Sequence, residues 1–368
     1  MREAEVVAAI ALALLAYTYF GYPVLVALLS RLWPLRVRDG AWEPMVTVCI
    51  PAHNAAGYAG PKIESLLAQD WPRERLEVLI YSDGSTDGTD EVIERYAARD
   101  PRVRLLRGGP RAGKPTALNR MRSEAGGEVL VLTDVRQPLE RGAIRALVRR
   151  MSDPAVGCVS GNLRLRGQAG AGVYWRYENW IRASEAAFRG MVGATGPLYA
   201  LRRVDLPAEL PSDTILDDVW IPMRLRLQGR RLLFCEEAVA WDEAFADERE
   251  FGRKVRTLAG SYQLFARMPR LLLPLANPSW FETMSHKVAR LLCPWALAAM
   301  AIASLVGAAT GSRPLLALLA GQVLFYGLAA AGGRAGRAGA LARTFVVLNG
   351  AAAVGLARWL SGSQRVTW

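Results

Sequence analysis

The chain has few cysteines, and their spacing fits neither a metal site nor a disulfide framework. Four occur in 368 residues, and no two form a CxxC pair. They are Cys49, Cys158, Cys235 and Cys293. Isolated cysteines of this kind are typical of buried apolar thiols. Internal repeats, low-complexity linkers and basic stripes with interleaved aromatics are also missing, so we expect no nucleic-acid partner.

Lysine is scarce although the chain is strongly basic. The net charge is +12, yet the only lysines are Lys62, Lys114, Lys254 and Lys287. One interpretation is that the positive charge attracts anionic lipid headgroups and pyrophosphates. The other is a compositional bias towards arginine. The sequence leaves both open.

Charge is missing altogether from long runs near the two ends. Residues 6–29, 291–311 and 314–333 are uncharged, and each is long enough for a bilayer core, which needs about 20 residues. The first run exceeds the core of a signal peptide, so we expect a retained anchor. Residues 344–357 are too short alone, and Arg343 would have to snorkel if they crossed. Three spans are expected and a fourth is left open.

Arginines flank these runs on one side. Arg31, Arg36 and Arg38 follow the first run, and Arg334 and Arg337 lie between the third and fourth. By the positive-inside rule, both stretches and the charged central domain face the cytoplasm. We expect an integral protein of a bacterial inner or plasma membrane.

These patterns divide the chain into five parts. We expect an anchor over 1–30, a cytoplasmic domain over 44–245 and interfacial amphipathic helices over 246–289. A membrane region of two or three spans over 290–360 and a tail over 361–368 complete the chain.

The central domain alternates strand and helix signals, which predicts an α/β fold with a mostly parallel sheet. The expected strands are 46–50, 77–82, 103–106 and 128–133, and the expected helices between them are 62–69, 87–98 and 115–125. After Gly161 the pattern is looser. Helices are expected there over 174–188, 215–227, 251–265 and 270–288, the last two at the membrane surface.

Asp83 and Asp87 follow the second expected strand. Carboxylates at the carboxyl end of such a strand can contact the base and ribose of a nucleotide. Alternatively, they form an Asx turn with Asp87 as a helix cap, which needs no ligand. The cap is favoured for Asp87, and Asp83 is left open.

The segment from Gly108 to Lys114 nearly matches a phosphate-binding P-loop. Pro115 replaces the residue that would hold magnesium, and it has no N–H for a phosphate cradle. A P-loop ATPase is therefore disfavoured. Lys114 remains a candidate phosphate ligand, and the alternative is a basic turn before a helix.

Asp134 ends the fourth expected strand, where a carboxylate can hold a divalent metal against a diphosphate or merely cap a turn. Asp217 and Asp218 are adjacent on a helix and point in different directions, so one could act as a general base. Arg253 and Arg256 share a helix face and could grip a leaving diphosphate or meet lipid headgroups.

Taken in order, these motifs resemble the membrane-bound family 2 glycosyltransferases, which include cellulose, hyaluronan and chitin-oligosaccharide synthases and exopolysaccharide enzymes. The resemblance covers residues 46–263. The matching elements are Pro51-Ala52-His53-Asn54, Asp83, Gly113-Lys114 with Ala117-Leu118-Asn119, Asp134, Gly193-Ala194-Thr195-Gly196 and Asp218.

The resemblance implies a GT-A fold and inverting transfer of a sugar from a nucleotide-diphosphate sugar, which we expect to be a UDP-sugar. It assigns donor binding to Pro51, His53, Asn54, Asp83, Lys114, Asp134, Arg253 and Arg256. It assigns acceptor binding to Gly193, Ala194, Thr195 and Gly196, a divalent Mg²⁺ or Mn²⁺ to Asp134, and the catalytic base to Asp218. The membrane runs suggest a lipid-linked or growing glycan acceptor.

Several positions depart from the family pattern. Alanines stand at 55 and 56 where acidic residues are usual, His53 replaces a tyrosine, and Arg136 replaces the second metal-binding carboxylate. The QxxRW motif of processive synthases is absent, and residues 253–257 occupy its place. These departures put metal dependence and processive synthesis in doubt. They leave a catalytically silent nucleotide-sugar-binding subunit as the main alternative, ahead of a P-loop NTPase.

Overall fold

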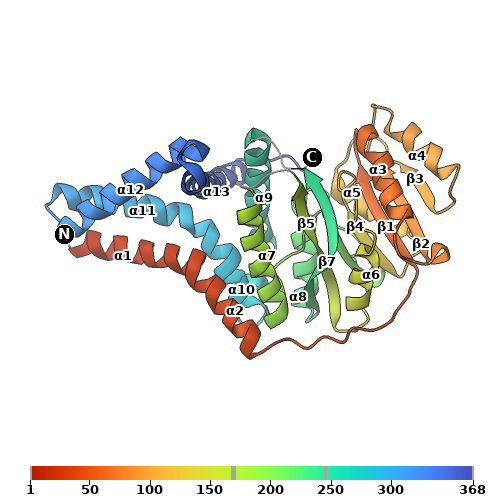
Figure 1. The fold of residues 1–368 in the computed structure, drawn as a ribbon, viewed down its shortest axis with the longest axis horizontal. Coiled ribbons are helices and arrows are strands. Elements are labelled where there is room, and N and C mark those ends of the chain that lie inside the picture. Colours follow the sequence, from red (N-terminus) through yellow and green to blue (C-terminus); the bar gives the residue numbers. More distant parts are fainter. Residues whose placement is uncertain (1, 167–170, 244–246, 367–368) are drawn as a thin grey trace.

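The computed structural model describes residues 2–166, 171–243 and 247–366. A sheet domain lies at one end of the elongated molecule, and long helices project from it at the other (Figure 1). The sheet has seven strands in the order β3-β2-β1-β4-β6-β5-β7. The strands are β1 (Val46–Ala52), β2 (Leu76–Ser82), β3 (Val103–Arg107), β4 (Val129–Thr133), β5 (Val156–Arg166), β6 (Leu198–Arg202) and β7 (Arg231–Glu243).

The first four strands are parallel, which confirms the expected sheet. β1 pairs with β2 and with β4, and β2 pairs with β3. Every residue of β1, β2 and β4 is buried, as the strands of a parallel sheet covered on both faces should be. β6 runs antiparallel to both β4 and β5, while β7 returns parallel to β5. The sheet is therefore mixed but mostly parallel.

Helices cover both faces of the sheet. Val48 and Ile50 of β1 belong to a core with Ile63 on one face, while Cys49 joins a second core with Leu118 on the other. The covering helices are α3 (Ala56–Leu67), α4 (Thr89–Ala97), α5 (Lys114–Glu124), α6 (Ala143–Arg150) and α8 (Asp217–Leu227). Short 3-10 turns lie at η2 (Arg73–Arg75) and η3 (Arg203–Asp205).

Two helices join the sheet domain to the helical end. These are α7 (Ala171–Phe188) and α9 (Asp247–Arg267), which lie between the sheet and the long helices (Figure 1). The expected helix over 270–288 is not continuous. It is divided into a 3-10 turn, η4 (Pro269–Leu272), the single turn α10 (Trp280–Glu282) and a π-helical segment, η5 (Thr283–Val288), which continues into α11.

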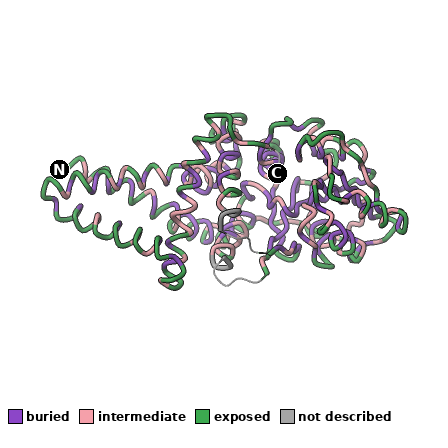
Figure 2. Tube along the Cα trace, turned by 90° about the horizontal axis from the view of Figure 1, so that it is seen from above, coloured by how far each residue is buried: buried purple, intermediate pink, exposed green. Residues whose placement is uncertain are grey.

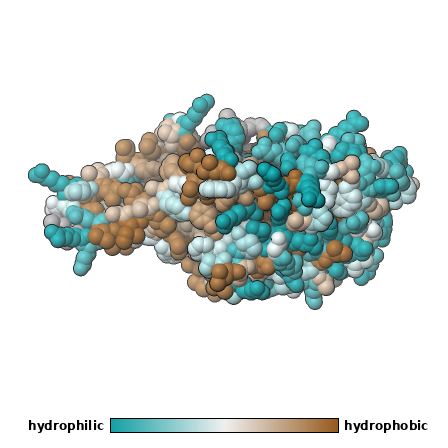
Figure 3. Space-filling model, turned by 90° about the horizontal axis from the view of Figure 1, so that it is seen from below, coloured by the Kyte–Doolittle hydropathy of each residue, from teal (hydrophilic) through white to brown (hydrophobic). Residues whose placement is uncertain are grey.

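The helical end contains α1 (Arg2–Ala16), η1 (Tyr17–Gly21), α2 (Tyr22–Leu32), α11 (Ala289–Ala309), α12 (Arg313–Ala331), η6 (Gly332–Ala335) and α13 (Gly336–Leu360). Among the described residues, three helical stretches are long and apolar enough to cross a membrane: Arg2–Leu32, Trp280–Ala309 and Arg313–Leu360. Exposed residues line the long helices (Figure 2), and apolar side chains gather on this end (Figure 3). The short run 344–357 lies within α13, which packs closely on α9 through Gly355.

Candidate active site

The carboxyl ends of β1, β2 and β4 meet at one edge of the sheet, as the sequence predicts for Asn54, Asp83 and Asp134. Asp83 is completely buried there. Its two carboxylate oxygens accept the backbone N–H groups of Ala112 and Gly113, each at 2.8 Å. Asp83 therefore holds the loop that delivers Lys114 to the start of α5.

The turn after β2 fits against the end of β1. His53 Nδ1 lies 2.8 Å from the carbonyl oxygen of Asp83, and Asn54 Oδ1 accepts the Thr86 N–H at 2.8 Å. Gly84 has φ +66°, and a Cβ there would lie 3.0 Å from backbone atoms of the Lys114 loop. Glycine is therefore required by both conformation and space. Pro51 lies inside β1, opposite Tyr81, so the strand runs two residues beyond the expected end.

Asp87 forms the Asx turn that the sequence favoured, but the N-cap residue of α4 is Gly88 and not Asp87 as expected. Its Oδ1 accepts the Thr89 N–H at 3.1 Å, in an Asx turn that precedes α4. Its Oδ2 accepts the Ala56 N–H at 3.1 Å, which joins α3 to the same turn. These hydrogen bonds lower the pKa of Asp87 although burial opposes the shift.

Lys114 brings two distant carboxylates together. Its ammonium nitrogen lies 3.0 Å from Asp134 Oδ1 and 3.3 Å from Asp217 Oδ2. Burial alone would lower the pKa of Lys114, but Asp134, Asp217 and Asp218 together raise it above its ordinary value. Lys114 is therefore a permanent cation at this edge of the sheet.

Asp217 and Asp218 begin α8 and have different surroundings. Asp217 is buried and accepts a hydrogen bond from Tyr199 at 3.0 Å in addition to its contact with Lys114. Asp218 lies against the glycine loop, because a Cβ at Gly196 would be 3.0 Å from Asp218 Oδ2. The Ala194 N–H also bonds the backbone oxygen of Asp218 at 2.8 Å. The structure thus joins the expected acceptor loop to the expected base.

Asp218 has the electrostatics of a general base. Burial raises the pKa of its carboxyl to about 6, Asp217 adds repulsion, and Lys114 and Lys287 act in the opposite direction. Within the described residues, no group donates a hydrogen bond to this carboxylate. A carboxylate of pKa about 6 that is free to accept a proton is well matched to general-base work near neutral pH.

Arg253 and Arg256 both lie on α9. Of the two, Arg256 is close to the start of α8. The Arg256 guanidinium donates to the carbonyl oxygens of Ile215, at 3.5 Å, and Val366, at 3.0 Å. It therefore braces the segment that precedes Asp217. Arg253 is exposed, and its donor contact remains a prediction. Arg136 forms an ion pair with Asp242 on β7, so a carboxylate of the sheet already balances its charge.

Three further residues at the site were not anticipated from the sequence. Lys62 is 1% exposed, and its ammonium donates to Thr133 Oγ1 at 2.7 Å and to the carbonyl of Gln137 at 2.5 Å. Burial lowers the pKa of Lys62 to about 7. Tyr199 and Arg182 contact Asp217 and Thr195, respectively. The sequence feature that could have identified Lys62 is its position on the apolar face of α3, beside Ile63 and Leu66.

The family of this domain follows from comparison with known proteins. Residues 47–202 match the family model for glycosyl transferase family 2, so this segment is a glycosyltransferase domain of that family. The match includes Asp83, Lys114, Asp134 and the glycine loop, so the near-match to a P-loop lies inside a glycosyltransferase domain.

A solved structure similar to this chain is the mannosyltransferase PcManGT from Pyrobaculum calidifontis, in complex with GDP-Man and Mn²⁺. The TM-score is 0.79 at 28% identity, over 96% of this chain and 99% of that one. The beta-monoglucosyldiacylglycerol synthase of Synechocystis is 25% identical over 53% of this chain and 43% of its own length. An N-acetylglucosaminyltransferase of Rhizobium is 28% identical over 56% and 48%. The chain thus spans about half the length of these two curated relatives.

Proposed function

We propose that this protein is a membrane-embedded inverting glycosyltransferase, with Asp218 as its general base. The observation that carries the proposal is the position of Asp218 against Gly196, with the cation Lys114 close enough to affect its charge. One carboxylate thus faces the loop assigned to the acceptor, while the lysine lies at the edge assigned to the donor. The main alternative, a catalytically silent subunit, does not account for a base of matched pKa at this place.

The reaction needs one displacement. Asp218 takes the proton of an acceptor hydroxyl as the hydroxyl oxygen attacks the anomeric carbon. The new carbon–oxygen bond forms opposite the leaving group, and the bond to the diphosphate oxygen breaks. The nucleoside diphosphate leaves with the electron pair, and Lys114 stabilises its charge. Asp217 and Tyr199 hold Lys114 and the start of α8 in position.

The residues present fit a divalent cation that is bound together with the donor. Asp134 has a half-exposed carboxylate, and Lys114 contacts only its Oδ1. No cluster of three His, Cys, Asp or Glu side chains suited to a metal occurs in the described part of the chain. Asp134 would therefore hold Mg²⁺ or Mn²⁺ only when diphosphate oxygens complete the coordination. The cation would supply further positive charge at the leaving diphosphate.

The donor is proposed to be a nucleotide-diphosphate sugar. A UDP-sugar is the expectation from the sequence, and the GDP-Man in the similar mannosyltransferase adds GDP-mannose as a second candidate. Full-length protein in nanodiscs should release a nucleoside diphosphate from one member of a panel of UDP- and GDP-sugars. Asp218→Asn should abolish transfer, and Glu209→Gln, which changes an exposed carboxylate that no site contact involves, should not. If no donor yields product with any acceptor, the silent-subunit alternative is preferred.

We also propose that the catalytic domain lies on the cytoplasmic face of the membrane, with membrane lipids around α1, α11 and α12. Arg31, Arg36 and Arg38 support this orientation. All four native cysteines are buried, so Glu209→Cys would introduce an exposed thiol on the domain. This thiol should resist an impermeant maleimide in intact cells and react after lysis. Labelling in intact cells would place the site on the other face.

A further inference from the structure

A buried lysine that the reaction described so far does not use lies beneath the site. Lys62 belongs to α3, and it is 1% exposed. In the described part of the chain no carboxylate lies within 4 Å of its ammonium, and Asp134 acts on its charge from further away. Burial lowers the pKa of Lys62 to about 7, which shows that this place disfavours the charged form. A residue that costs stability in this way is expected to have a functional reason.

The hydrogen bonds of Lys62 enclose the turn that carries Asp134. Its Nζ donates to Thr133 Oγ1 at 2.7 Å and to the carbonyl oxygen of Gln137 at 2.5 Å. These two residues lie directly before Asp134 and three positions after it. An ammonium has three N–H donors and the neutral amine still has two, so both bonds form in either protonation state. One side chain therefore holds both ends of the turn.

Thr133 extends this link to the loop beside the base. Its Oγ1 accepts from Lys62 and donates to the carbonyl oxygen of Pro197 at 2.6 Å. Thr133 is also the last residue of β4 that pairs with β6. Pro197 follows Gly196, where a Cβ would lie 3.0 Å from Asp218 Oδ2. Two consecutive hydrogen bonds thus lead from Lys62 to the loop that packs against the base.

We propose that Lys62 is a positioning residue that fixes the turn at Asp134 relative to the loop 193–197. This inference rests on the proposed function, which assigns the turn to the donor and the loop to the acceptor. Lys62 touches neither substrate and acts through Thr133 and Gln137. Transfer needs the reacting atoms in a near-attack geometry, so a small shift between the two sides lowers the rate.

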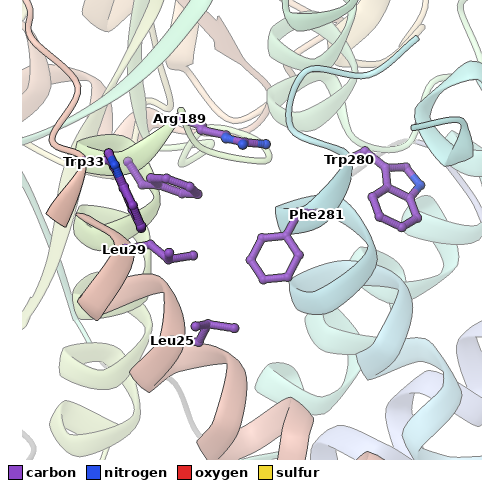
Figure 4. Close-up of a pocket in the computed structure, with 7 residues that line it drawn as sticks. Leu25, Leu29, Trp33, Arg189, Trp280 and Phe281 are labelled. Carbon is purple, nitrogen blue, oxygen red and sulfur yellow. The ribbon is translucent and has the colours of Figure 1, made fainter. Parts of the chain in front are cut away.

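Two control variants separate this role from general support of the fold. Ser65 lies one turn after Lys62 on α3, and its Oγ accepts the Leu139 N–H at 3.2 Å. Ser65→Ala therefore removes another bond between α3 and the segment after β4, but not one beside Asp134. At the helical end, Leu25 points into an apolar groove of about 830 Å³ between α2, the end of α7 and α10 (Figure 4). Leu25→Ala changes packing there and should not affect the sheet domain.

Amide hydrogen exchange, followed by mass spectrometry on the full-length protein in nanodiscs, tests the link without requiring turnover. Lys62→Met should speed exchange by about 10-fold in both segments, 134–137 and 193–196, because both lose hydrogen-bonded support. Ser65→Ala should leave the segment 193–196 unchanged, and Leu25→Ala should change neither. Faster exchange in only one segment of Lys62→Met, or equal loosening of both by Ser65→Ala, would overturn the proposal.

Binding of nucleotide provides a second readout of the same link. UDP or GDP with Mn²⁺ should slow exchange in 193–196 of the wild type, although the nucleotide binds on the side of Asp134. Lys62→Met should lose this slowing at saturating nucleotide. Thr133→Val should lose it and Thr133→Ser should keep it, since serine retains the hydroxyl, and this pair tests the link even if Lys62→Met fails to fold. Slowing that persists in Lys62→Met or Thr133→Val would overturn the positioning role.

Kinetics with the donor identified above complete the test. Lys62→Met should lower kcat by about 10- to 100-fold even at saturating donor, as for other residues that orient a site through a neighbour. Ser65→Ala should remain close to the wild type. A change confined to KM for the donor would contradict a positioning role. If the wild type binds neither nucleotide, the proposed function is contradicted, whereas exchange without nucleotide still decides whether Lys62 joins the two segments.

Discussion

The ammonium nitrogen of Lys114 lies 3.0 Å from Asp134 Oδ1, which joins the first turn of α5 to the end of β4. The two residues come from different crossovers of the sheet, and their side chains meet at the carboxyl edge of the parallel strands. A diphosphate that arrives there can take Lys114 as its counter-ion, while Asp134 becomes available to a cation. We infer that this ion pair keeps the donor site ordered before the donor binds.

Replacing Lys114 should weaken donor binding. Hydrogen bonds to charged groups contribute about 1.5–3 kcal/mol, so Lys114→Met should lower the affinity for the nucleoside diphosphate by about 10- to 150-fold. Isothermal titration calorimetry measures the change. Arg120→Gln, on an exposed position of the same helix, is the control and should have no effect. An unchanged affinity in Lys114→Met would show that Lys114 has a structural role and does not bind the donor.

The pH dependence of the reaction should reveal the coupling between Asp217 and Asp218. The base must be ionised, so kcat/KM should fall on the acid side with a midpoint of about 6, the pKa of Asp218. Asp217 is one of the causes that raise this pKa. Asp217→Asn removes that repulsion, so the acid midpoint should move to lower pH even if the rate falls. A midpoint that stays in place or rises would contradict the coupling.

Asp83→Asn should disorder the lysine loop. The carboxylate accepts the Ala112 and Gly113 N–H groups on separate oxygens, and the amide replaces one of these oxygens with an NH₂ donor, which would face a backbone N–H. Loss of a buried hydrogen-bond partner costs about 1–3 kcal/mol of unfolding free energy. Donor affinity should fall with it, and the double variant with Lys114→Met should be less than additive. Full additivity in the binding data would show that Asp83 acts independently of Lys114.

Metal dependence should appear only in the presence of nucleotide. EDTA should weaken binding of the nucleoside diphosphate, and Mg²⁺ or Mn²⁺ should restore it through Asp134. Without nucleotide, the protein should bind little of either cation. Asp134→Ala should remove the metal effect, whereas Arg136→Ala should leave it in place because Arg136 is bound to Asp242. If EDTA does not change the affinity for the nucleotide, that result would contradict a metal at Asp134.

The parallel half of the fold could be predicted because local signals agree there. Short apolar runs that end in polar turns predicted the bounds of β1 to β4 to within two residues. Helices α5 and α8 also begin within two residues of their expected positions. The antiparallel β6 could not be foreseen, because strand order depends on packing between distant segments. The segment 270–288 was expected to be one helix, but Pro269, Pro274 and Pro278 interrupt its start.

The site was predictable as a set of residues but not as a set of contacts. Asp83, Lys114, Asp134 and Asp218 were all candidates, yet the bond between Asp83 and the lysine loop joins positions 29 and 30 residues apart. Asp217 was expected to point elsewhere, and it contacts Lys114. Lys287 lies far along the chain from Asp218, yet its charge acts on the Asp218 carboxyl.

The stereochemistry of transfer tests the central claim most directly. The product formed by the full-length protein in nanodiscs is analysed by NMR for the anomeric configuration at the transferred sugar, alongside Asp218→Asn and the control Glu209→Gln. We predict inversion relative to the donor, a loss in Asp218→Asn of about 10²- to 10⁴-fold in rate, and nearly unchanged donor affinity in that variant. Retention of configuration, or undiminished transfer by Asp218→Asn, would contradict a single displacement with Asp218 as the base.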